Sequence, residues 1–319
     1  MDISVVVPLY NEEDNVQLLY EEIKGVLDTM AERAEIVFVD DGSRDTTLAK
    51  LEAIQAGDDH VRVVSLRRNF GQTAAMTAGF DHARGGIIIT MDGDLQNDPH
   101  DIPQLVGKLN EGYDVVTGWR HDRQDAFLSR RLPSQLANRL ISRVTGVGLH
   151  DYGCTLKAFR REVIDNINLY GEMHRFIPAI ASGMGISFTE VKVNHRARRF
   201  GTSKYGISRT IRVVLDLITV KFMLSYATRP LHVFGTVGVV SSLLGVLIAL
   251  VLTVQRQLYG IALANRPLLL LAVLLIFMGI QFITIGLLAE LVVRTYHESQ
   301  KKPIYYVRKV LGEPADGQG

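Results

Sequence analysis

The stretch that decides the fold of this chain is ITMDGDLQNDPHDIP, residues 89–103. An apolar run ends here in two carboxylates, Asp92 and Asp94, that lie one residue apart. Asp, Gly and Asn favour turns, and Asp98 before Pro99 suits the N-cap of a helix with proline at its first position. That local interpretation explains Asp98 but not the pair, whose like charges repel. The pair indicates either helix capping or a shared cation.

Short apolar runs alternate with helical periods on the N-terminal side of this stretch. The apolar runs predict β-strands at residues 3–7, 36–39, 61–66 and 87–91. The helical periods between them predict helices over residues 16–30, from about Thr46, and through residues 74–83. This alternation is typical of an α/β fold, in which helices cover both faces of a mostly parallel sheet.

Polar clusters follow three of these predicted strands. They are Tyr10-Asn11-Glu12, Asp40-Asp41-Gly42-Ser43 and Asp92-Gly93-Asp94. Parallel strands bring their carboxyl ends to one edge of a sheet, where α/β proteins bind their ligands. We therefore expect one strongly acidic rim, which suits a nucleoside ligand or a ligand bridged by a metal.

The acidic pair has the chemistry of a metal site. Asp92 and Asp94 offer hard oxygens to Mg²⁺ or Mn²⁺, ions that commonly combine one or two carboxylates with substrate phosphates. Such a pair occurs in many loops by chance, but its position after the fourth strand strengthens the metal interpretation. In the second cluster, Asp45 can cap the helix that begins at Thr46. This leaves Asp41 free to accept a hydrogen bond from the N–H of a base.

Composition narrows the functional classes. The 319 residues suit one good-sized domain and a smaller part. The formal net charge of +1 gives no whole-chain argument for nucleic acid, so nucleic acid is not expected among the partners. The single cysteine, Cys154, cannot form an internal disulfide and offers no zinc-binding spacing.

Two long stretches near the C-terminus contain no charged residue. They cover residues 233–254 and 268–289, and each would be about 33 Å long as a helix, enough to cross a bilayer core of about 30 Å. Buried core helices are the alternative, but charge-free runs of this length are rare in soluble domains. The connecting loop has only Arg256 and Arg266, whereas both outer flanks carry more Lys and Arg. The positive-inside rule then predicts a cell (inner) membrane protein with its large N-terminal domain and both termini in the cytoplasm.

The predicted organisation has four parts. Residues 1–204 form the cytoplasmic α/β domain, residues 232–293 two transmembrane helices, and residues 294–319 a cytoplasmic tail. Residues 205–231 combine apolar residues at helical spacing with interleaved basic ones, which favours amphipathic helices in the membrane interface. An ordinary helix packed on the α/β domain is the alternative for this segment.

Several motifs, taken in order, resemble those of a known enzyme family. VVVPLYNEEDN (5–15), VFVDDGSRDTT (37–47), MDGDLQNDP (91–99) and GWR (118–120) look like the family 2 glycosyltransferases with a GT-A fold. LHDYGCTLKAFRREV (149–163), HRARRFGTSKYG (195–206) and the C-terminal helix pair resemble the polyprenyl-phosphate glycosyltransferases within that family. That group includes dolichyl-phosphate mannose synthase, the bacterial GtrB-type glucosyltransferases and the aminoarabinose transferase. The resemblance covers about residues 3–310, and the bacterial members look most similar.

The resemblance implies roles for individual residues at the donor. The positions that hold the nucleoside are matched by Pro8, Tyr10, Glu12, Val39 and Asp41. The metal and the diphosphate of the nucleotide sugar are expected at Asp92, Asp94 and Gln96, with Mg²⁺ or Mn²⁺ as the cofactor.

A second set of residues is expected at the acceptor. The family positions that receive the acceptor phosphate are matched by Arg120, Arg130 and Ser134, although this chain is shorter than dolichyl-phosphate mannose synthase between Arg120 and the following helix. Arg198 and Lys204 match a basic loop that closes over the phosphates. The alternatives are solvated surface charges for Arg120 and Arg130, and a contact with anionic lipid for Arg198.

The resemblance leaves the sugar less well determined. The family often has Ser-Gly-Phe where this chain has Gly153-Cys154-Thr155, and Asp151 is either a site residue or the start of a turn. We expect inverting transfer of glucose or a related hexose from a UDP-linked donor to a membrane polyprenyl phosphate. The alternatives are mannose from GDP-mannose, or aminoarabinose from its UDP donor. A processive polysaccharide synthase is less well supported, because the only tryptophan is Trp119 and no QxxRW element is present. Related bacterial proteins suggest a homo-oligomer.

Overall fold

The computed structural model describes the chain in two compact units. One unit is Met1–Val220 with Pro303–Gly319, and the other is Lys221–Lys302. The described residues are 1–121, 138, 141–143, 145–167, 169, 173–182, 184–197, 230–260, 262, 267–299 and 304–312. The predicted site residues Arg130, Ser134, Arg198 and Lys204 and nearly all of the predicted interfacial segment, residues 205–229, lie outside them.

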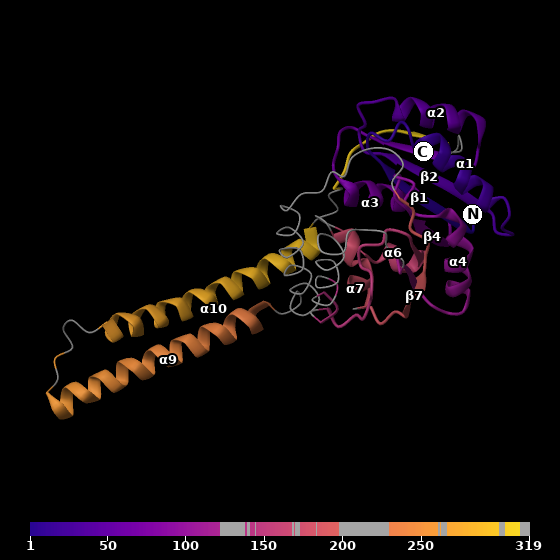
Figure 1. Ribbon diagram of the computed structural model, residues 1–319. Helices are drawn as coiled ribbons and strands as arrows, with labels where there is room; N and C mark the ends of the chain where they lie inside the picture. Colours follow the sequence, from indigo (N-terminus) through magenta and orange to yellow (C-terminus); the bar gives the residue numbers. More distant parts are fainter. Residues whose placement is uncertain are drawn as a thin grey trace. The chain divides into compact units, whose positions relative to one another are not determined.

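A mixed, mostly parallel sheet forms the centre of the first unit (Figure 1). Its strands are β1 (Ile3–Leu9), β2 (Ala34–Asp40), β3 (Val61–Leu66), β4 (Ile87–Thr90), β5 (Val115–Trp119), β6 (Lys157–Arg160), β7 (Phe188–Lys192) and β8 (Val307–Leu311). The spatial order is β7-β5-β6-β4-β1-β2-β3-β8. Strand β1 pairs in parallel with β2 and β4, and β2 with β3, whereas β6 and β8 run antiparallel to their neighbours. The α/β fold expected from the sequence is therefore confirmed.

Helices cover the two faces of this sheet. The longer ones are α1 (Val16–Leu27), α2 (Thr47–Gly57), α3 (Gln72–His82) and α4 (Ile102–Asn110), and short ones are α6 (Arg161–Asp165), α7 (Ile177–Ser182), η1 (Pro99–Asp101) and η3 (Met173–Phe176). The apolar face of α1 lies in the same core cluster as Val5 and Val7. Val6, which points to the opposite face, meets α3 so closely that a Cβ on Gly79 would lie 2.2 Å from its side chain. Glycine at this position is what allows α3 to pack on the sheet.

The strand register brings the predicted polar clusters together. Leu9 pairs with Asp40, and Val6 pairs with Thr90, so the carboxyl ends of β1, β2 and β4 lie side by side. The chain turns sharply after two of these strands, where Asn11 and Leu95 have positive φ angles of 52° and 61°. The acidic rim expected at this edge of the sheet is present.

Strand β8 comes from the C-terminal segment, to which the sequence analysis assigned no secondary structure. It pairs antiparallel with β3, with Val64 opposite Val310. The hydroxyl of Tyr305 donates a hydrogen bond of 2.6 Å to a carboxylate oxygen of Asp81 on α3. The chain thus leaves the sheet unit, forms the second unit, and returns to complete the sheet at its β3 edge.

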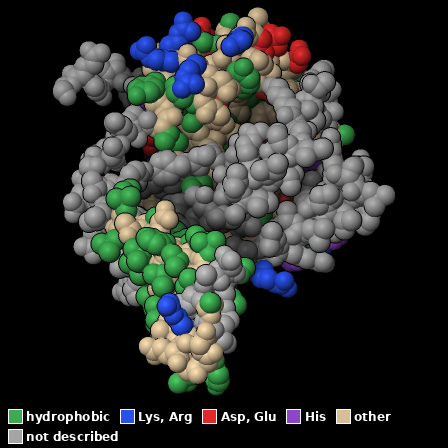
Figure 2. Space-filling view, turned by 90° about the vertical axis from the view of Figure 1, so that its left-hand side faces the viewer, with side chains coloured by type: hydrophobic (Ala, Val, Ile, Leu, Met, Phe, Trp, Pro, Cys, Tyr) green, Lys and Arg blue, Asp and Glu red, His purple; other side chains and the backbone are tan. Residues whose placement is uncertain are grey.

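The second unit consists of two long helices, α9 (Pro230–Tyr259) and α10 (Pro267–Ser299), that pack along each other (Figure 1). Gly238 faces Gly279, and a Cβ added to Gly238 would lie 2.5 Å from the Gly279 carbonyl oxygen. Small residues at a helix contact allow such close approach in membrane helices. Both helices are long and apolar enough to cross a membrane, over Phe234–Tyr259 and Pro267–Leu288. Figure 2 shows hydrophobic side chains gathered on this hairpin. Leu247 and Leu270 are among its exposed residues.

Candidate active site

Asp92 and Asp94 follow β4, and Asp94 lies close enough to affect the charge of Asp92. Gln72 donates its side-chain amide to Asp92 Oδ1 at 2.7 Å, and the Asp92 N–H donates to Asn97 Oδ1 at 3.2 Å. Burial, and then the neighbouring Asp94 carboxylate, raise the pKa of Asp92 to about 6. Two crowded carboxylates of this kind fit a divalent cation, because a shared positive charge offsets their repulsion.

Magnesium held by one or two carboxylates usually takes its other ligands from substrate phosphates and water. Among the described residues, no group of three or more His, Cys, Asp or Glu side chains is arranged to hold a metal ion. Gln96, the third predicted ligand, donates its backbone N–H to Asp94 Oδ1 at 3.2 Å and its side-chain amide to the Arg196 carbonyl at 3.4 Å. Two carboxylates with room for phosphate oxygens match the coordination that magnesium usually has in nucleotide enzymes.

The backbone around the pair is held in place by its neighbours. A Cβ on Gly93 would lie 2.2 Å from the Leu9 side chain, so glycine is required where the turn passes over β1. Asp98 caps the following 3-10 helix by accepting from the His100 N–H at 3.1 Å, as predicted. Arg196 donates to the same carboxylate oxygen at 2.7 Å. Burial acts to raise the pKa of Asp98, but the bonds from His100 and Arg196 outweigh it and lower that pKa.

Asp41 lies at the same rim but is not free, contrary to the sequence-based expectation. Its two carboxylate oxygens accept hydrogen bonds from the backbone N–H groups of Phe70 and Gly71, at 2.7 and 2.9 Å. Burial raises the pKa of Asp41 to about 6, although these two bonds act to lower it. Each oxygen retains a lone pair, so the carboxylate can still accept a hydrogen bond from a ligand.

The other residues predicted to hold the nucleoside lie at or near the carboxyl ends of β1 and β2. Glu12 accepts from the side-chain amide of Asn15 at 2.6 Å, and its backbone N–H donates to Thr47 Oγ1 at 2.9 Å. Tyr10 and Pro8 are half-buried at the end of β1. Val39 is fully buried, and its side chain points toward Gly79, so in this structure it supports the rim from inside the sheet.

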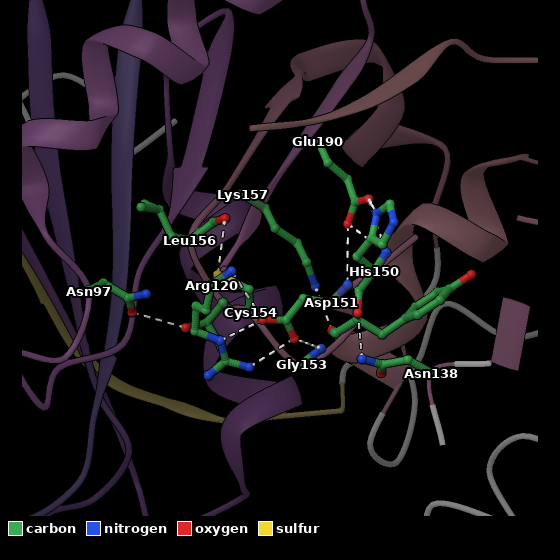
Figure 3. Close-up of polar contacts among 12 residues, drawn as sticks. Asn97, Arg120, Asn138, His150, Asp151, Gly153, Cys154, Leu156, Lys157 and Glu190 are labelled. Carbon is green, nitrogen blue, oxygen red and sulfur yellow. Dashed lines mark hydrogen bonds and ion pairs between the residues drawn. The ribbon is translucent and has the colours of Figure 1, made fainter. Parts of the chain in front are cut away.

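Arg120 and Asp151 form a buried, bidentate ion pair (Figure 3). Arg120 Nε and Nη2 donate to the two carboxylate oxygens at 2.7 and 2.9 Å, and the side chains are only 16% and 4% exposed. Burial alone would lower the pKa of Arg120, but Asp151 raises it, so the guanidinium stays charged. The structure thus identifies Asp151 as the residue that orients Arg120. Among the described residues, Arg120 Nη1 makes no hydrogen bond and remains available for an anion.

Several residues that contribute to this region were missed by the sequence analysis. They include Gln72, which binds Asp92, and Glu190, which accepts hydrogen bonds from the backbone N–H of His150 at 2.9 Å and of Asp151 at 3.2 Å. Lys157 was also missed, although a charged residue inside the apolar run LKAF is a signal that sequence alone offers. Partners such as Gln72 and Glu190 carry no such signal, because they come from distant strands and helices.

Comparison with known proteins agrees with this geometry. Residues 4–167 match the model of the family described as Glycosyl transferase family 2. The chain is 46% identical to the dodecaprenyl-phosphate galacturonate synthase of Rhizobium johnstonii over 98% of its own length and 94% of the relative. It is 42% identical to the undecaprenyl-phosphate 4-deoxy-4-formamido-L-arabinose transferase of Shewanella sediminis, over 99% of this chain and 94% of that one.

A solved structure shows the same fold at lower sequence identity. Glucosyl-3-phosphoglycerate synthase from Mycobacterium tuberculosis, solved with Mn²⁺ and UDP, has a TM-score of 0.55 and 21% identity, covering 70% of this chain and 79% of that one. This likeness confirms the GT-A fold, and the two relatives confirm the narrower resemblance. The chain therefore belongs to glycosyl transferase family 2, as a polyprenyl-phosphate glycosyltransferase.

Proposed function

We propose that this enzyme transfers galacturonate or a 4-amino-4-deoxyarabinose derivative from a nucleotide donor to a membrane polyprenyl phosphate. The sequence analysis favoured glucose, but the relatives named above support its alternative, aminoarabinose, and add galacturonate, which it did not consider. In the structure, the observation that carries the proposal is the crowded Asp92–Asp94 pair, which lies at the same sheet edge as Asp41. A nucleotide sugar has the diphosphate and the base that such an edge can hold.

The chemistry requires positioning more than proton transfer. A phosphate monoester has its second pKa near 6, so the acceptor is largely a dianion at neutral pH and is already a nucleophile. Its oxygen bonds to the anomeric carbon of the sugar as the bond to the leaving diphosphate breaks, with the inversion that the family resemblance implies. Arg120, oriented by Asp151, is placed to reduce the repulsion between the two anions. We assign the acceptor phosphate also to Arg130 and Ser134, and loop closure to Arg198 and Lys204.

We propose Mg²⁺ or Mn²⁺ as the cofactor. Asp92 and Asp94 would hold it, and when bound it would supply positive charge to the leaving diphosphate. The proposal rests on the raised pKa of Asp92 beside Asp94 and on the Mn²⁺ in the solved relative of the same fold.

The direct test of the function is a transfer assay with the purified full-length protein. UDP-galacturonate, the UDP-linked formamido-arabinose, UDP-glucose and GDP-mannose would each be offered with undecaprenyl phosphate, and the product identified by mass. We expect a lipid-phosphate sugar product from one of the first two donors. Transfer only from UDP-glucose or GDP-mannose, or release of a polymer, would contradict the proposal. Mass measurement of the protein in detergent also tests the homo-oligomer that we infer from related bacterial proteins.

The proposed base contact of Asp41 predicts a pH dependence of donor binding. The carboxylate form accepts the N–H of the base more strongly than the neutral acid does, and the pKa of Asp41 without ligand is about 6. Donor affinity should therefore fall below pH 6, by at most about tenfold per pH unit, and level off above it. The Asp41→Asn variant should bind the donor more weakly than the wild type at pH 7. Its donor affinity should also lack the part of the pH dependence that comes from Asp41.

Calorimetry between pH 5 and 8 measures this effect. A nucleotide sugar is the right ligand, since its diphosphate, unlike that of free UDP, does not titrate near neutral pH. Because Asp92 also titrates near pH 6, the informative quantity is the difference between the wild-type and Asp41→Asn profiles. Parallel profiles would rule out the base contact.

The return of the chain to the sheet predicts the membrane topology. Strand β7, which precedes α9 in the chain, and strand β8, which follows α10, belong to the same sheet, so both ends of the hairpin must lie on one side of a membrane that it crosses. With basic residues concentrated in the outer flanks, we propose that this side is the cytoplasm. Both termini should resist protease added to intact cells, and a tag beside Tyr259 should be reachable from outside. Protease cleavage at the N-terminus of intact cells would overturn the orientation.

A further inference from the structure

Lys157 on β6 is a buried cation that lacks an anionic partner in the described part of the chain. The residue is 3% exposed, and its ammonium donates one hydrogen bond, of 3.3 Å, to the carbonyl oxygen of Tyr152. An ammonium group has three hydrogens to donate, and lysine is almost never fully buried unless it is paired. Desolvation lowers the pKa of Lys157 to about 8, so the group is still mostly protonated at neutral pH.

The ammonium faces a small cavity that is rich in positive charge. The cavity has a volume of about 10 Å³, and its lining includes Lys157, Arg175, His174, Cys154 and Thr155. Burial keeps His174 neutral by lowering its pKa well below 6.5, and keeps the Cys154 thiol neutral by raising its pKa to about 11. Lys157 and Arg175 therefore supply the charge of the lining. The nearby carboxylate of Asp151 is already held by Arg120, as Figure 3 shows.

The cavity lies directly beside the acidic pair. Thr155, from its lining, donates to Asn97 Oδ1 at 3.1 Å, and the same oxygen accepts the N–H of Asp92. The Thr155 hydroxyl also lies close enough to Asp92 to lower the pKa of that carboxyl, and the charge of Arg175 acts in the same direction. A donor whose diphosphate is bound at Asp92 and Asp94 would thus bring its sugar next to Lys157.

We infer that this cavity receives the carboxylate of the donor sugar, so that the enzyme selects nucleotide-linked uronic acids. This inference rests on the proposed function and chooses between its two donor classes. The size of the cavity fits this assignment: about 10 Å³ admits one water-sized group, and an oxygen of a carboxylate on the donor sugar is of that size. A neutral sugar would leave the buried ammonium of Lys157 without an anion, at a cost in binding.

The test compares two donors that differ only in this group. UDP-galacturonate and UDP-galactose share their stereochemistry, but the second carries a neutral hydroxymethyl in place of the carboxylate. The wild-type enzyme should prefer the uronate by about 10²-fold or more in kcat/KM. Lys157→Met, which keeps the length of the side chain and removes its charge, should reduce this preference to about tenfold or less while changing kcat/KM for UDP-galactose only about threefold. Lys108→Met, at a partly exposed lysine on α4, should keep the full preference.

Two results would overturn the inference. One is an equal loss for both donors in Lys157→Met, which would assign the lysine to the diphosphate or to the fold. The other is a wild-type enzyme without a preference for the uronate. Calorimetry with the wild-type protein, without acceptor, measures the affinity for each of the two donors. It tests the same preference without a variant and without the transfer reaction. Tight uronate binding without transfer would refute the proposed function alone, whereas transfer without uronate preference would refute this inference alone.

Discussion

Replacing Asp94 with asparagine is expected to lower kcat by about 10²–10³-fold and to leave the protein folded. Asparagine keeps the shape of the side chain and can still accept the Gln96 N–H, which lies 3.2 Å from Asp94 Oδ1. It removes half of the negative charge that would hold the cation and, with it, the leaving diphosphate. Because Asp94 raises the pKa of Asp92 by repulsion, its neutralisation should leave the melting temperature unchanged or higher.

The experiment combines turnover with thermal unfolding in detergent. Asp165→Asn removes an exposed carboxylate on α6 and should behave as wild type in both measurements. Chelation of divalent ions with EDTA should reproduce the loss of turnover in the unmodified enzyme. Full activity of Asp94→Asn, or full turnover in EDTA, would show that the pair does not hold a catalytic cation. A large drop in melting temperature would instead assign Asp94 to the fold.

Replacing Asp151 with asparagine is expected to destabilise the sheet unit by about 3–5 kcal/mol. The reason is that Arg120 would keep its buried charge but lose its anionic partner, because the single oxygen of asparagine can accept only one of the two short bonds of 2.7 and 2.9 Å. Unfolding can be followed by fluorescence, since the only tryptophan, Trp119, precedes Arg120 and stacks on His150 with a centroid distance of 4.3 Å. Breaking the partly exposed pair between Lys108 and Glu111 with Glu111→Gln should cost less than about 1 kcal/mol.

A double variant separates stability from function at this pair. Arg120→Met with Asp151→Leu removes both charges, and apolar replacement of a buried ion pair often recovers most of the stability. We expect the double variant to be more stable than Asp151→Asn and yet to lose most transfer activity, because Arg120 no longer faces the anions. An active double variant would show that the pair serves only the fold. An Asp151→Asn variant as stable as wild type would show that water or another group reaches Arg120.

Much of the fold could be predicted from local patterns. The β-branched run at residues 3–7 and the helical period through Val16, Leu19, Ile23 and Val26 match β1 and the buried face of α1. Such patterns report which face of an element is buried, and burial is what the sequence encodes at short range. The charge-free stretches correspond in the same way to α9 and α10. Strand β8 was not predicted, because VRKVL is only five residues long and contains two charged residues, Arg308 and Lys309. Its partner strand, β3, also lies far away in the sequence.

In the candidate site, too, some features could be predicted from local sequence and others could not. The sequence by itself determined that carboxylates follow the second and fourth strands, because the residue types and their position after apolar runs are local properties. Only the tertiary structure decided that Phe70 and Gly71 hold Asp41, that Asp151 orients Arg120, and that Lys157 has no anionic partner among the residues that the structure describes. These contacts join residues about 30 positions apart or depend on strand order, and a hydrogen bond needs its two atoms within about 3 Å. Local periodicity does not determine distances between side-chain atoms to within about 3 Å, because the packing of distant strands and helices sets those distances.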